Sequence, residues 1–198
     1  MAMIQDRIRE SIAVKQRILS DEHLLSLVTD AARLISDCVE LGGKVLLCGN
    51  GGSASDALHI TGELVGRFQR ERTAMAAICL NADTTTMTAI ANDYGFDHVF
   101  ERAVEGLMTP RDVLLGISTS GNSENVYLAV QKAKKIGGRS IAFLGRDGGK
   151  IRAVADIPIV VPGDNTARIQ ESHIMLGHII CEMVEDAYAR QKSGISGS

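Results

Sequence analysis

The chain has 198 residues, of which 45% are hydrophobic and 23% are charged, and its formal net charge is −3. The length fits one domain, and the composition is that of a soluble globular protein, which excludes a largely disordered chain. Lys and Arg number 21 against 24 Asp and Glu, so the chain lacks the basic excess of a general nucleic-acid-binding protein.

The chain carries no predicted export or membrane segment. Charges recur through residues 1–17, which have no apolar core of a signal peptide. No apolar run approaches the ~18 residues that a transmembrane helix needs. The cysteines lie far apart within apolar runs, which indicates buried thiols rather than disulfides or a metal site: Cys38, Cys48, Cys79 and Cys181. We therefore expect a cytoplasmic protein without a nucleic-acid or membrane partner.

Two amphipathic helices are expected in residues 1–41, as a helical pair ahead of the main domain. Asp21 is placed to cap the second helix, and Gly42-Gly43 ends it. The isoleucines of the first helix recur at near-helical spacing: Ile4, Ile8, Ile12 and Ile18. The two helices cannot bury their stripes on each other alone, so we expect them to pack on the later domain or on other copies of the chain.

Five short apolar runs follow, and each leads into a polar loop and a helical pattern. They are residues 44–48, 74–80, 112–117, 140–144 and 157–161. This alternation predicts an α/β fold, a three-layer sandwich with a five-stranded parallel sheet. We expect this domain to span residues 42–190, with a flexible tail at 191–198. Ligands of such sheets bind at the carboxyl ends of the strands.

Two loops at those ends suit a phosphorylated ligand. Residues 49–55 read GNGGSAS, which lacks the spacing of a dinucleotide-binding motif or a P-loop. Its glycines still let backbone amides approach an oxygen-rich ligand at a helix N-terminus. Residues 118–123 read STSGNS at the corresponding place after the third run. Four hydroxyls in six residues exceed what helix capping requires, which favours phosphate binding over capping alone.

The helix after the first loop has two unlike faces. His59 and Glu63 lie four residues apart on one face, together with Gly62 and Gly66. Such a pair is usually a helix-stabilising contact, but each glycine costs up to ~1 kcal/mol in a helix. This cost favours a face that a ligand or another chain approaches closely. The opposite face is expected to hold the core stripe: Ala57, Thr61, Leu64, Val65 and Phe68.

The last helix shows the same division. His178 falls opposite the core stripe, near Glu171, Glu182 and Glu185. Apolar residues also lie outside the stripe, so both sides of this helix are expected to be buried. The expected stripe is Ile169, Leu176, Ile180, Met183 and Ala187. We interpret both helices as parts of an active site between subunits.

Four sequence blocks in this order resemble sugar isomerase (SIS) domains, which have a flavodoxin-like fold. They are GNGGSASDALHITGEL, NDYG, GISTSGNSENV and TARIQESHIMLGHI, at residues 49–64, 92–95, 116–126 and 166–179. Together they resemble more closely the bacterial phosphoheptose isomerase family, along nearly the whole chain. The resemblance implies a homotetrameric aldose–ketose isomerase. It would convert D-sedoheptulose 7-phosphate to D-glycero-D-manno-heptose 7-phosphate through an enediolate and feed activated heptose into surface polysaccharide.

The resemblance also implies roles for individual residues. Glu63 would be the base at carbon, and His178 the partner acid–base. Zinc would be held by His59, Glu63, Gln170 and His178. Substrate would be bound by Asn50, Gly51, Gly52, Glu63, Asn92, Asp93, Ser118, Thr119, Ser120, Ser123 and Gln170. Asn92 and Asp93 are expected in a turn.

The spacing of the implied zinc ligands is awkward. Gln170 and His178 are eight residues apart, about 12 Å along a straight helix. Both reach one ion only if it lies midway or if the helix begins irregularly. Gln170 with His173 is the alternative metal pair, and otherwise His173, like His23 and His98, is interpreted as a structural or surface residue.

Two other functions stay open from the sequence. One is a non-catalytic binding protein, because a close relative of the family regulates replication initiation by binding the initiator protein. The other is an isomerase or a sensor for a different phosphosugar. The presence of both Glu63 and His178 favours an enzyme, since a scaffold does not need an acid–base pair.

Overall fold

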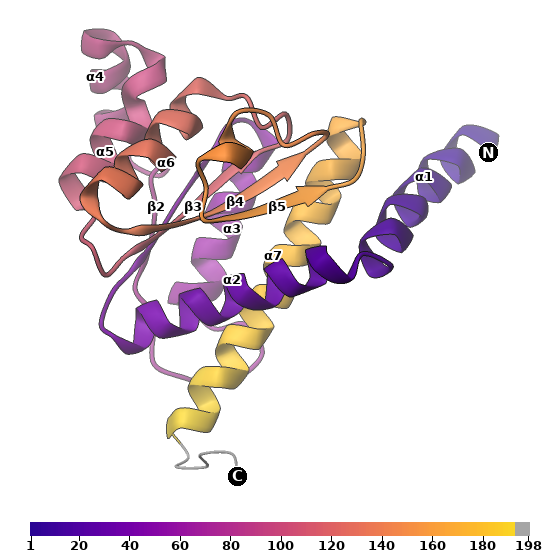
Figure 1. The fold of residues 1–198 in the computed structure, drawn as a ribbon, viewed down its shortest axis with the longest axis horizontal. Coiled ribbons are helices and arrows are strands. Elements are labelled where there is room, and N and C mark those ends of the chain that lie inside the picture. Colours follow the sequence, from indigo (N-terminus) through magenta and orange to yellow (C-terminus); the bar gives the residue numbers. More distant parts are fainter. Residues whose placement is uncertain (193–198) are drawn as a thin grey trace.

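The computed structural model describes residues 1–192, and its centre is a five-stranded parallel sheet (Figure 1). The strands are β1 (Val45–Gly49), β2 (Ala77–Cys79), β3 (Val113–Ser118), β4 (Arg139–Gly145) and β5 (Ile157–Val161). They lie in the order β2-β1-β3-β4-β5, which is the flavodoxin-like order. The predicted α/β fold with a five-stranded parallel sheet is therefore confirmed.

Helices cover both faces of the sheet (Figure 1). They are α1 (Ala2–Leu19), α2 (Glu22–Glu40), α3 (Gly52–Val65), α4 (Thr84–Tyr94), α5 (Val99–Leu107), α6 (Glu124–Ile136) and α7 (Thr166–Lys192), with 3₁₀ turns at Phe96–His98 and Ile151–Ala153. Helices α2, α3 and α7 pack on one face, whereas α5 and α6 cover the other and α4 packs on α5. Among the described residues, no helix has both the length and the apolar character that crossing a membrane requires.

The sheet separates two hydrophobic cores. In β1, Val45 and Leu47 point into the core beneath α2, α3 and α7, whereas Leu46 and Cys48 point into the core beneath α5 and α6. Successive side chains of a strand alternate between faces, so burial of both faces produces the continuous apolar runs seen in the sequence. The four cysteines are buried, as predicted.

The strand β2 is shorter than its apolar run. The run predicts a strand over residues 74–80, but only Ala77–Cys79 pair with β1. This strand is at the edge of the sheet, and Ile78 keeps 36% of its surface exposed. Of the remaining residues in the run, the Ala76 carbonyl oxygen and the Leu80 N–H still bond β1, and there is no second neighbouring strand to extend the pairing.

The two N-terminal helices differ in how they pack. The Asp21 side chain accepts a hydrogen bond from the Leu24 N–H and caps α2 as predicted. Helix α2 belongs to the core with α7 and β5. Helix α1 enters that core only through Val14 and Ile18 near its end, and its first half projects from the body (Figure 1). The predicted domain limit at residues 41–42 falls between α2 and β1.

The last helix extends into the predicted tail. Residues 191 and 192 belong to α7, and the rest of the tail lies outside the described residues.

Two predictions about burial are wrong. Val65 is 44% exposed, because α3 ends there and the chain turns away at Gly66. The stripe that α3 buries instead runs through Ser53, Asp56, Ala57, Ile60 and Leu64. On α7, Glu185 was expected opposite the core but is only 2% exposed. Its burial is possible because both carboxylate oxygens accept hydrogen bonds.

Candidate active site

The two predicted ligand loops lie side by side. They follow β1 and β3, which are neighbouring strands at the point where the strand order reverses, and ligands of this fold bind in the crevice at such a point. Helices α3 and α6 begin at these loops, and neither has a side-chain cap at its N-cap residue, Gly51 or Ser123. Two helix N-termini thus direct positive potential and backbone N–H groups toward one crevice.

Two hydroxyl groups of the second loop bond each other, and a third accepts from the backbone. The Ser118 and Ser123 Oγ atoms lie 2.9 Å apart, and the Asn122 N–H donates to the Ser120 Oγ at 3.2 Å. Ser123 occupies the N-cap position of α6, but its hydroxyl makes no cap hydrogen bond. Capping therefore does not account for these hydroxyls. The loop is tight at Gly121, where φ is +68° and a Cβ would lie 2.0 Å from the Gly148 carbonyl oxygen.

A pair of amides joins the two loops. Asn50 donates to the Asn125 Oδ1 at 2.8 Å, and Asn125 donates back to the Asn50 Oδ1 at 2.9 Å. Asn125 is 2% exposed and lies in the first turn of α6. The Asn50 side chain is thus engaged within the protein. The sequence did not identify Asn125 as its partner, since its burial is seen only in the folded chain.

Three of the predicted site residues meet where α3 packs on α7. The Nε2 atoms of His59 and His178 lie 2.8 Å apart, and the His59 Nε2 lies 3.1 Å from the Glu63 Oε1. One donor atom from each residue lies within 4.8 Å of the others. The ring of Phe68 stacks on His178 with centroids 5.7 Å apart. The expected His–Glu contact along α3 is present, and His178 joins it from a different helix.

This cluster has the donors that a transition metal needs. Two imidazole nitrogens and a carboxylate oxygen are a common protein set for zinc in catalytic sites, where a further position stays open. The His59 side chain is 51% exposed and that of Glu63 is 22% exposed, so the cluster is reachable from outside this chain. The described residues therefore fit a metal ion.

Gln170, the fourth predicted ligand, is held by other groups. Its Nε2 donates to the Asp56 Oδ1 at 2.9 Å and to the Gly52 carbonyl oxygen at 3.4 Å. The amide lies directly against Gly52, where a Cβ would be 3.0–3.2 Å from its three terminal atoms. Because the nitrogen faces Asp56, the Gln170 Oε1 is the atom left to meet a ligand.

Asp56 is a site residue that the sequence reasoning missed. It is 4% exposed, and its Oδ2 has no hydrogen-bond partner among the described residues. Burial raises the pKa of this carboxyl, an effect opposed by the hydrogen bond from Gln170 and by the charges of His59 and His178. Asp56, His59 and Glu63 recur at helical spacing, which is the pattern that could have revealed it.

His173 belongs to the core and not to this cluster. It is fully buried, with its Nε2 2.8 Å from the Leu144 carbonyl oxygen and its ring 5.6 Å from that of Phe143. Burial lowers the pKa of His173 to about 4. The structural role considered for His173 fits this position, and the alternative metal pair with Gln170 is not formed.

Asn92 and Asp93 lie elsewhere in the chain. The turn predicted for them is wrong, because they form the last part of α4, which ends at Gly95 with φ +91°. The Asn92 side chain donates to the Asp93 Oδ1 at 2.8 Å, and α4 has no buried residue. Since α4 packs on α5, across the sheet from α3 and α7, these two side chains face outward from a single chain.

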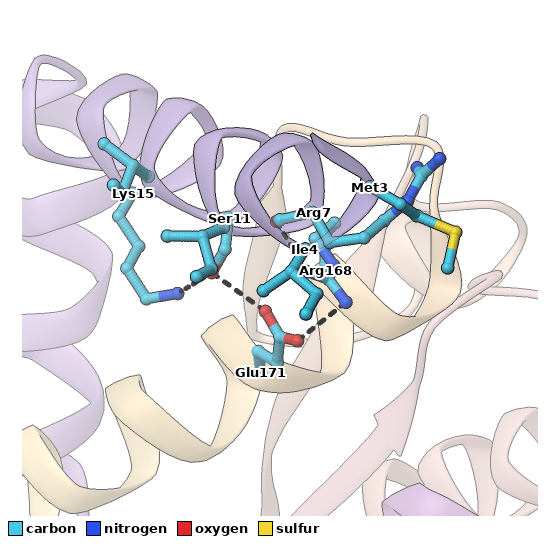
Figure 2. Close-up of a pocket in the computed structure, with 9 residues that line it drawn as sticks. Met3, Ile4, Arg7, Ser11, Lys15, Arg168 and Glu171 are labelled. Atoms are coloured by element: carbon cyan, nitrogen blue, oxygen red, sulfur yellow. Dashed lines mark hydrogen bonds and ion pairs between the residues drawn. The ribbon is translucent and has the colours of Figure 1, made fainter. Parts of the chain in front are cut away.

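An open groove of about 570 Å³ lies between α1 and the start of α7 (Figure 2). Ser11 donates to the Glu171 Oε2 at 2.9 Å and accepts from the Lys15 Nζ at 2.6 Å. The apolar wall of the groove is made of Met3, Ile4, Ile8 and Ile12. This groove is separate from the crevice at the strand ends and presents an apolar helix face.

Comparison with known proteins agrees with this geometry. Residues 9–145 match the family model of the SIS domain. The phosphoheptose isomerase of Clostridium acetobutylicum is 48% identical over 182 residues, which cover 92% of this chain and 93% of the relative. The chain belongs to the phosphoheptose isomerase family. The phosphoheptose isomerase of Aquifex aeolicus is 51% identical, over 90% of this chain and 92% of the relative.

A solved structure of the phosphoheptose isomerase from Neisseria gonorrhoeae superimposes with a TM-score of 0.88 at 45% identity. The match covers 93% of this chain and 98% of that one. The likeness to this phosphoheptose isomerase therefore extends over nearly the whole fold.

Proposed function

We propose that the chain is an aldose–ketose isomerase that interconverts D-sedoheptulose 7-phosphate and D-glycero-D-manno-heptose 7-phosphate, the first step in making activated heptose. The observation that carries this proposal is the meeting of His59, Glu63 and His178 at one point, in a chain that belongs to the phosphoheptose isomerase family. A scaffold protein has no need of this acid–base set, which argues against the regulator of replication initiation.

The reaction moves one proton between C1 and C2 and another between their oxygens. We assign the carbon-bound proton to the Glu63 carboxylate, which is largely shielded yet still reachable. His178 exchanges the proton on oxygen. Because the His59 and His178 Nε2 atoms share a short contact, at most one of them carries a proton there. Stabilisation of the enediolate is the second requirement of this chemistry.

The phosphate of the substrate belongs at the N-terminus of α6. Hydroxyls of the second loop would surround it, together with the first backbone N–H groups of α6, apart from that of Val126, which donates to the Asn125 Oδ1. The residues we assign to this role are Ser118, Thr119, Ser120 and Ser123. No lysine is needed, because helix dipole and amides supply the positive potential.

The sugar hydroxyls would be bound by the first loop and by α7. Because the Asn50 side chain is engaged with Asn125, we assign the backbone of Asn50, Gly51 and Gly52 to this contact. Gln170 would present its Oε1, since its nitrogen is held by Asp56.

We further propose Zn²⁺ as the metal, held by His59, Glu63 and His178, with Gln170 as the predicted fourth ligand. A bound zinc ion would polarise the oxygens of the substrate as a Lewis acid. Glu63 and His178 would then each have two tasks, and each serves in proton transfer only while its donor atom is free of the metal. Elemental assay of protein purified without chelator tests the assignment.

Self-association as a homotetramer is supported by two faces that one chain leaves uncovered. Ile4, Ile8 and Ile12 on α1 are all about half exposed, and an apolar helix face of this kind is normally covered. The exposed α4 would bring Asn92 and Asp93 to the crevice of a neighbouring copy. Light scattering should give four times the 21.2 kDa of one chain.

The four free cysteines fit a reducing compartment such as the cytoplasm.

The direct test of the function is incubation with sedoheptulose 7-phosphate, followed by NMR. We expect signals of the aldose phosphate, and exchange of a carbon-bound proton with solvent. If other ketose phosphates react and sedoheptulose 7-phosphate does not, the chain is an isomerase for a different phosphosugar. If no ketose phosphate reacts, the isomerase proposal fails.

A further inference from the structure

A buried carboxylate on α7 holds the loop that follows α3. Glu185 Oε2 accepts hydrogen bonds from the backbone N–H groups of Gln69 and Arg70 at 2.7 and 2.8 Å. Its Oε1 accepts from the Phe68 N–H at 3.0 Å and from the Arg72 Nε at 3.1 Å. These four donors lower the pKa of Glu185, against the effect of burial. Glu185 therefore stays ionised inside the protein.

Its partner Arg72 caps the end of α3. The Arg72 Nη2 donates to the Glu63 carbonyl oxygen at 2.7 Å, and its Nη1 donates to the Leu64 and Gly66 carbonyl oxygens at 2.9 and 3.3 Å. The last carbonyls of a helix have no partner within it, so the guanidinium satisfies them. The side chains of Arg72 and Glu185 are 5% and 3% exposed.

This ion pair joins the two helices that carry the candidate active site. Arg72 holds the backbone of Glu63 itself, and Glu185 holds the backbone of Phe68, whose ring stacks on His178. His178 and Glu185 are seven residues apart on α7, which places them on the same side of the helix two turns apart.

We propose that Arg72 and Glu185 are positioning residues, which fix α3 against α7 so that His59, Glu63 and His178 meet and Phe68 covers His178. The effect on turnover rests on the proposed isomerase function, whereas the effect on the cluster does not. Neither residue contacts the cluster's donor atoms, so they act through the backbone of Glu63 and the ring of Phe68.

The sharpest variant is Glu185→Gln. A glutamine has the same shape, but its NH₂ group would face two N–H donors whichever way the amide is turned. We expect the loop at residues 68–70 to loosen and zinc affinity to fall about tenfold, the lower end of the effect of losing a direct partner of metal ligands, because Glu185 acts on the ligands only indirectly. The kcat should fall while the KM stays within about twofold, since the phosphate loop is untouched.

Asp112→Asn is the matched control. Asp112 is also 2% exposed, and its carboxylate accepts from the Lys44 and Thr109 N–H groups and from the Lys44 Nζ. It lies before β3, at the opposite end of the sheet from the crevice. We expect this variant to lose stability but to keep its zinc affinity and kcat.

The experiment compares zinc titrations of metal-stripped proteins at a temperature where circular dichroism shows each variant folded. NMR of the His178 ring protons gives a second readout, because the Phe68 ring shifts them through its ring current. We expect that shift to be lost in Glu185→Gln and kept in Asp112→Asn. If Glu185→Gln does not fold, Arg72→Lys replaces it, since lysine keeps the charge but cannot bond the α3 carbonyls as a fork.

Two results would overturn the proposal. One is an unchanged His178 shift with wild-type zinc affinity in a folded variant. The other is an equal loss in Asp112→Asn, which would reduce the pair to general stabilisation. A wild-type protein that neither binds zinc nor isomerises the sugar would instead contradict the proposed function, and the His178 shift would still test the positioning role.

Discussion

The Nε2 atoms of His59 and His178 lie 2.8 Å apart although 119 positions separate the two residues in the chain. One ring comes from the helix that follows the first strand and the other from the last helix. Each ring has little reason to face the other for stability alone, since His59 is half exposed. The contact therefore places two proton-carrying groups and Glu63 at one point on the protein surface.

Replacing Glu63 or His178 should remove activity and leave the fold intact. We expect Glu63→Gln and His178→Gln each to lower kcat by about 10²–10⁴-fold, the range that positioned general acids and bases contribute. Both positions are only partly buried, so thermal unfolding should move little. NMR of the sugar phosphate measures the rate. Near-normal turnover in either variant would refute the role of that residue.

Metal removal should separate a zinc enzyme from a metal-free one. Dialysis against a chelator should abolish turnover, and added Zn²⁺ should restore it. His59→Asn should bind zinc at least tenfold more weakly, because one of three donors is lost. His98→Asn is the control, since His98 pairs with Glu101 on the α5 side of the protein. Full activity in protein shown to be metal-free would remove zinc from the proposal.

Gly62 offers a test of whether another chain covers α3. Nothing lies within 4 Å of a Cβ built at Gly62, so Gly62→Ala should stabilise an isolated chain by up to ~1 kcal/mol through its helix propensity. If this face packs on another copy, the added methyl group should weaken assembly.

Sedimentation velocity measures the assembly of this variant, with Gly106→Ala as the control. Gly106 is exposed on α5 and is equally open. A Gly62→Ala protein that assembles like the wild type would show that the face is free.

His173 should make stability fall in mild acid. Burial lowers its pKa to about 4, whereas an unfolded chain has a histidine pKa of about 6.5. Above pH 6.5 both states are neutral at this ring. Between pH 6.5 and 4 the His173 ring is protonated in the unfolded chain but stays neutral in the folded one. The free energy of unfolding therefore falls, by about 3 kcal/mol in all.

The comparison for this pH effect is His173→Gln, whose amide can still donate to the Leu144 carbonyl oxygen. Its free energy of unfolding, measured in urea, should depend less on pH than that of the wild type. If the free energies of unfolding of the variant and the wild type fall in parallel from pH 7 to pH 4.5, His173 is not the group that causes the loss of stability.

The strands and the parallel sheet could be predicted because buried strands leave a plain sequence pattern. Runs such as residues 44–48 are apolar throughout, since both faces of β1 are covered. The edge strand β2 was overestimated in length because its run looks the same but has one neighbour only. The order of the strands was predicted from the family resemblance, since an apolar run does not reveal which strand it pairs with in the sheet.

The candidate site was predictable where the chemistry is local and less so where partners are distant. His59 and Glu63 share a helix turn, which the sequence displays. The burial of Asp56 and Glu185 was missed because a charged residue normally indicates exposure to solvent, and only the folded chain shows the partners that permit its burial. Val65 was misplaced because the end of α3 is set by Gly66 and not by the apolar pattern.

The paired amides of Asn50 and Asn125 tie the loop after β1 to the first turn of α6. The place assigned to the phosphate is therefore linked directly to the loop from which α3, the helix that carries Glu63, begins. A sugar phosphate one carbon shorter, seated by its phosphate, would hold its carbonyl short of Glu63. Selectivity for chain length would then be built into the scaffold, and loosening this one amide pair should broaden the range of sugars accepted.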